Sequence, residues 1–322
     1  MKLLLIAGGW SSEREVSLRG AAGMAKALRA LGHSVTEFDL KARFDALLST
    51  AAEHDFALIN LHGQPGEDGL VQAMLECVGC PYQGAGPAGS FLALNKAAAK
   101  QLFRHAGLPT ADWEFLPCPP QADWQPRLPY PLFVKSNTGG SSLRLGRATN
   151  RQELDAVLKE IFAAGETAII EPELKGREIT CAILGEEALP PLLIEPVAGD
   201  FFDYASKYAQ GGAREICPAP IGEALSKKVR ELALAAHHVL GLTGISRADF
   251  ILDADDNLTL LEVNTLPGMT STSLVPKEAQ AVGLDFGQML ERLIELGLAR
   301  HAGRKEVLPK IQTGVLDSVY TS

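Results

Sequence analysis

The strongest constraint on the fold is an alternation of short apolar runs and helix-periodic segments in the first part of the chain. Three apolar runs predict buried strands, at residues 2–7, 34–38 and 56–61. Apolar residues recur at helical spacing over 16–31, after a Ser12 and Glu15 pair that fits a capping box, and 69–78 predicts a further helix. Alternating strands and helices are typical of a doubly wound α/β lobe with a parallel sheet.

Two smaller α+β lobes are expected to follow. The second lobe is expected to contain a helical stretch over 87–106, a proline-rich connection, strand 132–136, a helix over 151–164 and strand 167–171. The third is expected to contain strands 178–184 and 192–195, a helix over 224–240, a β-hairpin of 246–253 and 258–264, and two short closing helices. The expected domains are 1–95, 96–172 and 173–300, with a tail of 301–322.

Composition and charge exclude several classes of protein. With 46% hydrophobic and 21% charged residues among 322, the chain can bury a core, which excludes wholesale disorder. Its formal net charge of −9 argues against unselective binding to nucleic acid or anionic membranes. No apolar run approaches the ~18 residues of a membrane-spanning helix. The five scattered cysteines predict small buried thiols in a cytoplasmic protein rather than a zinc site.

The strongest chemical signal is a group of polar residues in the predicted hairpin. Arg247 and Asp249 are two residues apart on one strand, so their side chains share a face. The same holds for Glu262 and Asn264 on the other strand. Their neighbours are apolar, and charges held in such a hairpin are costly unless they bind something. Oxygen ligands beside a guanidinium suit Mg²⁺ that carries nucleotide phosphates, whereas a solvated face of alternating charges is the structural alternative.

Two further segments are candidates for nucleotide binding. Lys135 ends a predicted strand and precedes a Gly/Ser-rich turn over 136–142, whose hydroxyls and free amides can close over phosphates. No Walker sequence occurs, and such a turn is more often simply a hairpin. The backbone near 171–174 can present a carbonyl and an amide to an adenine edge, although a plain linker between lobes fits the same spacing.

Residues 84–89 match the G-x-G-x-x-G pattern of dinucleotide-binding proteins. That pattern belongs in the first turn between strand and helix, yet here it follows the third or fourth strand. No Asp or Glu occurs between Glu76 and Asp112, so the acid that would bind the ribose is also missing. We interpret the segment as a glycine hinge, which makes a dinucleotide-dependent oxidoreductase the disfavoured alternative.

A series of short segments, to about residue 297, carries a resemblance to a known family. The segments are Gly8-Gly9 with 12–17, 61–63 with 66–69, Lys96, 140–142, 203–204 with 207–208, 217–219, and 247–276. The last one, which reads EVNTLPGMT at 262–270, is the most specific. In these segments, and in their order, the chain resembles the D-alanine–D-alanine ligases of the ATP-grasp superfamily.

This resemblance implies three domains, with ATP sandwiched between the central and C-terminal lobes. It implies a ligase that joins two D-alanines for peptidoglycan precursors, through a D-alanyl phosphate formed from the γ-phosphate of ATP. Positioning and charge neutralisation are what phosphoryl transfer needs most, and the residues present suit both. The resemblance also implies ATP as substrate, two Mg²⁺ ions (or Mn²⁺), a homodimer and a cytoplasmic location.

The resemblance assigns a role to each of a set of residues. The expected ATP contacts are Lys96, Lys135, Ser141, Ser142, Glu171 and Leu174 (at the adenine), Glu178 (at the ribose) and Lys207. The expected metal ligands are Asp249, Glu262 and Asn264, with Arg247 and the Gly268 amide stabilising an oxyanion. Glu13 with nearby His62 is expected to hold the first D-alanine, Ser273 with Leu274 the second, and Glu13, Ser141 and Tyr208 to form a hydrogen-bonded set. Without the resemblance, Glu13 would be interpreted as an ordinary first-turn acid and Lys207 as a solvated charge.

Departures from the family pattern leave substrate choice and turnover open. They are Trp10 for a small polar residue, Ser136 for a proline, Arg144 for a glycine, Pro172 for a lysine and Phe202 for a tyrosine. Arg144 can stiffen or charge the phosphate-binding turn. The alternatives are a ligase with another acceptor (D-serine, D-lactate or another amino acid) and a catalytically silent nucleotide-binding protein. Tyr208 favours an amine acceptor.

Overall fold

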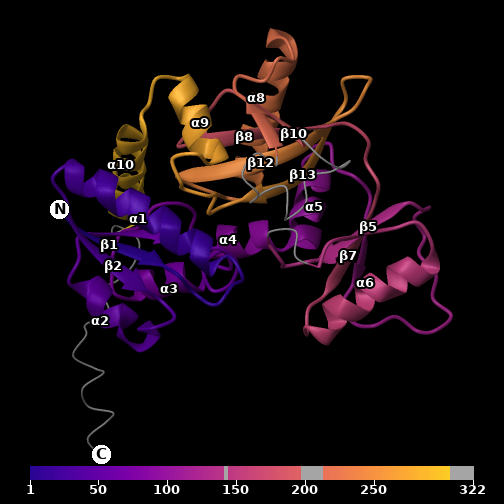
Figure 1. Ribbon diagram of the computed structural model, residues 1–322, viewed down its shortest axis with the longest axis horizontal. Helices are drawn as coiled ribbons and strands as arrows, with labels where there is room; N and C mark the ends of the chain where they lie inside the picture. Colours follow the sequence, from indigo (N-terminus) through magenta and orange to yellow (C-terminus); the bar gives the residue numbers. More distant parts are fainter. Residues whose placement is uncertain (141–143, 197–212, 305–322) are drawn as a thin grey trace, which may run out of the picture.

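The chain folds into three lobes that together place the candidate site residues. In Figure 1 the N-terminal lobe is indigo, the C-terminal lobe is orange to yellow, and the central lobe projects away from both. This computed structural model describes residues 1–140, 144–196 and 213–304. No helix within these ranges is long and apolar enough to cross a membrane.

The N-terminal lobe is built on a parallel sheet, as predicted. Its strands β1 (Lys2–Ala7), β2 (Ser34–Asp39) and β3 (Phe56–Asn60) have the spatial order β2-β1-β3. Its helices are α1 (Arg14–Ala30), α2 (Leu47–Ala52), which follows the short 3-10 turn Phe44–Ala46, and α3 (Leu70–Cys77). The predicted capping box is wrong, because Glu13 is the N-cap residue of α1 and no side chain caps the helix.

The helical stretch expected over 87–106 consists of two helices, α4 (Pro87–Leu94) and α5 (Lys96–His105). The break falls at Asn95, whose side-chain oxygen accepts a hydrogen bond from the backbone amide of Ala98 at 3.1 Å. Asn at an N-cap satisfies an amide that the helix itself leaves unpaired, so it starts a new helix here. This break fixes the direction of α5, which carries two lysines used below.

The glycine-rich segment 84–89 is a tightly packed junction between the N-terminal and C-terminal lobes. A Cβ atom on Gly89 would lie 3.2 Å from the Gly241 carbonyl oxygen, and one on Gly244 would lie 3.0 Å from the Gly84 nitrogen. Backbone approaches of this kind leave no space for a dinucleotide. The geometry therefore agrees with the interpretation of this segment as structural.

The central lobe is an antiparallel sheet covered by one helix. The sheet consists of β4 (Glu114–Leu116), β5 (Leu132–Ser136), β6 (Gly146–Ala148) and β7 (Ala168–Pro172), in the spatial order β4-β7-β5-β6. Helix α6 (Arg151–Ala163) packs against it, with Leu154, Leu158 and Ile161 buried. This lobe has a hydrophobic cluster of its own, drawn from residues 116–170.

The C-terminal lobe contains the predicted hairpin within a larger antiparallel sheet. Its strands are β8 (Arg177–Leu184), β9 (Glu187–Ala188), β10 (Leu192–Pro196), β11 (Ala213–Ile216), β12 (Ile245–Leu252) and β13 (Leu258–Asn264). Its helices are α8 (Glu223–Val239), α9 (Leu274–Ala281) and α10 (Phe286–Arg304). The main path of the sheet is β11-β10-β8-β12-β13. The expectation of two short closing helices is wrong for α10, which has 19 residues and packs against α1.

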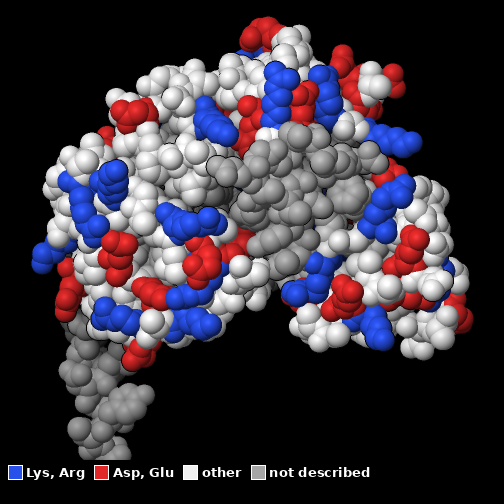
Figure 2. Space-filling model, viewed as in Figure 1, with Lys and Arg blue, Asp and Glu red and all other residues white. Residues whose placement is uncertain are grey.

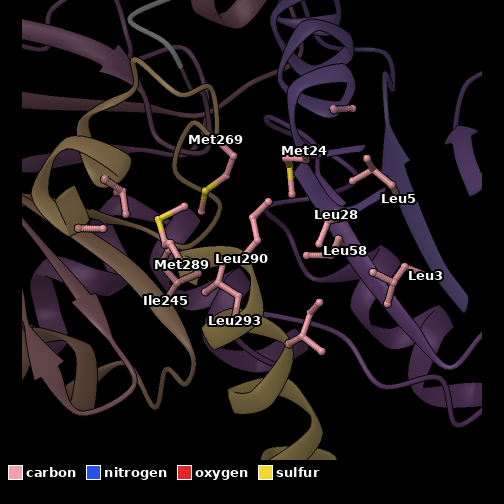
Figure 3. Close-up of a cluster of buried hydrophobic side chains, with 14 of the residues drawn as sticks. Leu3, Leu5, Met24, Leu28, Leu58, Ile245, Met269, Met289, Leu290 and Leu293 are labelled. Carbon is pink, nitrogen blue, oxygen red and sulfur yellow. The ribbon is translucent and has the colours of Figure 1, made fainter. Parts of the chain in front are cut away.

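A large hydrophobic cluster joins residues from the two ends of the chain. Figure 3 shows Leu3, Leu5, Met24, Leu28 and Leu58 from the N-terminal lobe beside Ile245, Met269, Met289, Leu290 and Leu293 from the C-terminal lobe. These two lobes therefore share a core, although residues 96–172 separate them in the sequence.

The cysteines only partly follow the expectation of buried thiols. All five lie in the described part of the chain, and each is free. Cys80 and Cys181 are buried and Cys217 is half-buried, whereas Cys77 and Cys118 are exposed. Two of these thiols are therefore open to solvent.

Candidate active site

The hairpin of β12 and β13 brings together the four polar side chains that the sequence singled out. Asp249 lies directly opposite Glu262, and Arg247 lies directly opposite Asn264. Because alternate residues of a strand share a face, all four side chains project to one side of the hairpin. A β-bulge between Asp249 and Phe250 shifts the pairing register. The four residues therefore lie in the short regular stretch of pairs between the bulge and the end of β13.

Arg247 is held in place by Asp249. Its Nε and Nη2 atoms donate to the two carboxylate oxygens, each at 2.8 Å, and Thr180 Oγ1 donates to Asp249 Oδ1 at 2.7 Å. Burial alone would lower the pKa of Arg247, but the Asp249 carboxylate outweighs burial and raises it. The guanidinium is therefore charged and fixed, with donors left to face a ligand.

The oxygen atoms on this face fit a magnesium ion that is shared with a substrate. Asp249 and Glu262 supply carboxylates, and Asn264 supplies an amide oxygen that accepts from Leu266 N at 3.0 Å. No three His, Cys, Asp or Glu side chains gather into a metal site within the described ranges. Two acids and one amide are too few for an all-protein cage, but they suit Mg²⁺ whose other ligands are phosphate oxygens and water.

Two expected phosphate-binding lysines approach from the central lobe and the first turn of α5. Lys96 Nζ donates to the Gly139 carbonyl oxygen at 2.7 Å and lies 3.4 Å from Glu262 Oε2. Lys135, on β5, lies 2.6 Å from Glu171 Oε2. Lys96 therefore links the Gly/Ser turn after β5 to the hairpin of the C-terminal lobe.

The Glu171 side chain is buried between two lysines. It is 5% exposed and lies between Lys135 and Lys100, with Lys100 Nζ 2.5 Å from Oε1. Burial would raise the pKa of Glu171, but the two lysines outweigh burial and lower it. Any adenine contact from Glu171 must therefore come from its backbone. Sequence reasoning missed Lys100, which is fully buried although a lysine on an amphipathic helix is ordinarily solvated.

The residues expected at the first amino acid lie together beneath the Gly/Ser turn. Glu13 and His62 are 6% and 8% exposed, and His62 Nδ1 is 3.9 Å from Glu67 Oε1. A Cβ atom on Gly140 would lie 3.9 Å from Glu13 Oε2 and 3.7 Å from Glu67 Oε2. Burial would lower the pKa of His62, but Glu67 outweighs burial and raises it. Glu67 was not singled out, although it lies in one of the segments that carry the resemblance.

The residues expected at the second amino acid lie at the start of α9. Ser273 is the N-cap residue, and its Oγ accepts from Thr270 N at 3.1 Å. A Cβ atom on Gly268 would lie 3.1 Å from Ser273 Oγ, so the Gly268 backbone is close to this helix end. Leu274 is the first residue of α9 and is half-buried. Amides at a helix N-terminus favour a carboxylate, which agrees with the expected role.

Other expected site residues are either less defined or outside the described ranges. Leu174 lies half-buried between β7 and β8, and Glu178 lies on β8 opposite Ile251 and Ile194. Ser141, Ser142, Lys207 and Tyr208, with the departure Phe202, lie outside the described residues.

The remaining departures are accommodated locally. Arg144 has a φ of +52°, which explains why a glycine suits this position, and its side chain is ion-paired with Glu166 of the same lobe. Trp10 is 49% exposed and packs edge-on against Phe44, 5.5 Å between ring centroids. Ser136 is buried at the end of β5, and Pro172 ends β7.

The central lobe carries Lys135, and the C-terminal lobe carries the acidic hairpin with Arg247. This pair of α+β lobes is the architecture of the ATP-grasp class of ligases. A family model described as the C-terminus of D-ala D-ala ligase matches residues 102–295. The D-alanine–D-alanine ligase of Desulfovibrio desulfuricans is 75% identical over 93% of this chain and 98% of its own length. That of Nitratidesulfovibrio vulgaris (strain DP4) is 62% identical over 94% of this chain and 100% of its own length. The chain belongs to the D-alanine–D-alanine ligase family.

A solved structure supports the same assignment. The D-alanine–D-alanine ligase from Bacillus anthracis, complexed with ATP, is similar with a TM-score of 0.84 and 32% sequence identity. The match covers 94% of this chain and 99% of that one. The ATP-grasp architecture expected from the sequence is therefore confirmed.

Proposed function

We propose that the protein joins two D-alanines at the expense of ATP and so supplies D-alanyl-D-alanine for peptidoglycan precursors. The observation that carries this proposal is the paired face of Arg247, Asp249, Glu262 and Asn264, with Lys96 reaching it from α5. The family membership identifies the chemistry, and this face supplies the charges that the chemistry needs.

In the first step, the carboxylate of one D-alanine attacks the γ-phosphorus of ATP. The new C–O–P linkage forms as the bond to ADP breaks, and Lys96 and Lys135 hold the phosphate oxygens in position. Glu13, with His62 beside it, would hold the ammonium group of this D-alanine. Their burial strengthens that contact because little water competes for it.

In the second step, the amine of the other D-alanine attacks the acyl carbon of D-alanyl phosphate. The ammonium group of the acceptor first releases a proton to solvent, the peptide bond then forms as the acyl carbon–oxygen bond to phosphate breaks, and inorganic phosphate leaves. Arg247, fixed by Asp249, and the Gly268 amide would donate to the oxyanion that develops on the carbonyl oxygen. Ser273 and the N-terminus of α9 would hold the carboxylate of the acceptor.

We propose that Asp249, Glu262 and Asn264 hold Mg²⁺, or Mn²⁺ in its place, up to two ions with the nucleotide. When bound, the metal neutralises phosphate charge and orients the γ-phosphate. Glu262 is the ligand most suited to a test, because its side chain is 34% exposed and its loss leaves the Arg247 pair intact.

The test measures ADP release and product mass with Mg-ATP and amino acids supplied singly and in pairs. D-alanine should give ADP, phosphate and the dipeptide, and L-alanine should give none. Glu262→Gln should lower turnover at least about 100-fold, whereas Glu231→Gln, a surface change on α8, should leave turnover unchanged. ATP binding without ADP release for any D-amino acid would contradict the proposal, and a product containing D-serine or D-lactate would change the acceptor.

We further propose a cytoplasmic homodimer that binds small molecules and not nucleic acid. ATP is a cytoplasmic substrate, and the exposed free thiols Cys77 and Cys118 suit a reducing compartment. On the face shown in Figure 2, Lys and Arg side chains are interspersed with Asp and Glu, which does not favour a nucleic-acid backbone. Sedimentation equilibrium tests the dimer, and a mass of one chain at micromolar concentration would contradict it.

A further inference from the structure

A buried charge cluster lies beside the candidate nucleotide site. Glu171 lies between two lysines, with Lys100 Nζ 2.5 Å from Oε1 and Lys135 Nζ 2.6 Å from Oε2. Lys100 is 0% exposed and the Lys135 side chain is 17% exposed. Of the two lysines, Lys135 is therefore the one that can reach a ligand.

The charge balance of this cluster suggests a function for the buried Lys100. A buried pair of Lys135 and Glu171 alone would be neutral, and the carboxylate would compete with phosphate for the same ammonium group. Burial lowers the pKa of Lys100, but the Glu171 carboxylate 2.5 Å away opposes this and favours the charged form. With Lys100 protonated, the three groups together carry one net positive charge. Water is largely excluded here, so this difference of one charge is poorly screened.

We propose that Lys100 is a positioning residue that neutralises Glu171 and thereby leaves the charge of Lys135 available to nucleotide phosphates. This inference rests on the proposed function, because it assumes that Lys135 contacts the phosphates of ATP. The expected role of Glu171 is an adenine contact. In this proposal its side chain instead binds Lys100 and Lys135.

A second set of contacts fixes Lys100 to the C-terminal lobe, against which α5 packs. Its Nζ donates to Thr110 Oγ1 at 2.8 Å, and Thr110 Oγ1 donates to the Leu260 carbonyl oxygen at 2.9 Å. Leu260 lies on β13, two residues before Glu262, and its amide donates to the Pro109 carbonyl oxygen at 2.7 Å. Lys100 therefore sets the position of the cluster relative to the hairpin that bears the proposed metal ligands.

A lysine that only fills space is the competing explanation. That lysine would matter for packing, and a second substitution nearby would not repair its loss. The charge argument predicts the opposite, because removing the Glu171 charge as well restores one net positive charge. The double variant Lys100→Met/Glu171→Gln therefore separates the two explanations.

The experiment measures the dissociation constants of ATP, ADP and adenosine by calorimetry, with Mg²⁺ and without D-alanine. Lys100→Met should weaken ATP binding about tenfold or more, which corresponds to about 1.4 kcal/mol. Adenosine binding should change less than about twofold, because it carries no phosphate. Lys100→Met/Glu171→Gln should return ATP affinity to within about threefold of wild type, and Lys100→Arg should stay close to wild type. In steady state, the KM for ATP should rise more than kcat falls.

Three results would overturn the inference. They are an unchanged ATP affinity in Lys100→Met, an equal loss of adenosine affinity, and a double variant that binds ATP as weakly as Lys100→Met. If Lys100→Met fails to fold, the double variant and Lys100→Arg still decide, because a double variant that folds but binds ATP poorly contradicts the charge argument. Failure of the wild-type protein to bind ATP would refute the proposed function instead.

Discussion

We expect Glu278→Gln to stabilise the protein at alkaline pH and to leave it nearly unchanged at acidic pH. Glu278 lies on α9 and is 0% exposed. Its Oε2 accepts the Ala182 amide at 2.6 Å, whereas Oε1 has no hydrogen-bond partner among the described residues. Burial raises the pKa of Glu278 from 4.5 to about 8, against the lowering effects of the Ala182 amide and Arg247 and with a raising effect of Asp249.

The sign and size of the effect follow from proton binding. Between pH 4.5 and pH 8 the folded protein keeps the Glu278 proton and the unfolded chain loses it. The contribution to stability is therefore fully present below pH 4.5 and is lost as the pH rises toward 8. At about 1.36 kcal/mol per pH unit, and with titration incomplete at both ends of the range, this amounts to about 3.5 kcal/mol between pH 5 and pH 8. Glutamine has no proton to lose, so the variant should lack this loss.

The assay is urea unfolding of wild type and Glu278→Gln at pH 5, 6.5 and 8, followed by fluorescence and circular dichroism. The difference in unfolding free energy between variant and wild type should grow by about 3.5 kcal/mol from pH 5 to pH 8. Glu231→Gln, whose side chain is 65% exposed, is the matched control and should show no such trend. Parallel pH profiles for wild type and Glu278→Gln would refute the reasoning.

Two further predictions concern the hairpin and the junction between lobes. Asp249→Asn leaves the buried Arg247 without its carboxylate. It should therefore destabilise the fold by about 3 kcal/mol, measured by urea unfolding, and lower kcat at least about 100-fold, measured by ADP release. Near-normal turnover would contradict the assigned role. Gly69 has a φ of +87°, and a Cβ atom there would lie 2.4 Å from the Pro87 carbonyl oxygen, whereas Gly79 has a φ of +68° and open space around it. Gly69→Ala should therefore cost at least about 2 kcal/mol more than Gly79→Ala, and equal unfolding midpoints for the two would show that the close contact relaxes freely.

Much of the fold follows from local patterns in the sequence. Strand β1 and strand β5 match their predicted bounds, and the hairpin appears where its turn residues put it. Two of the errors among the helices have local causes. The break at Asn95 was readable, because Asn is a strong N-cap residue inside an otherwise unbroken pattern. The Ser12 capping box was a plausible pattern, but the N-cap lies one residue later, at Glu13, and α1 begins at Arg14.

The site was predictable where one element carries it and not where distant elements meet. Arg247, Asp249 and Glu262 share a hairpin, so a period of two was enough to bring them together. Lys100 meets Glu171 only because α5 and β7 are packed into the same lobe interface, and no local pattern encodes that meeting. Burial then reverses the ordinary expectation for a lysine, which spacing alone cannot reveal.

The core shared by the two ends of the chain also governs how the protein is made. Leu58 and its neighbours leave the ribosome long before Met289 and Leu290, the residues that cover them. At about 5–20 residues per second, this delay is on the order of ten seconds or more. During this delay the apolar face of the nascent N-terminal lobe is uncovered and is a natural substrate for chaperones. The central lobe, in contrast, can complete its own core as soon as residue 170 has emerged.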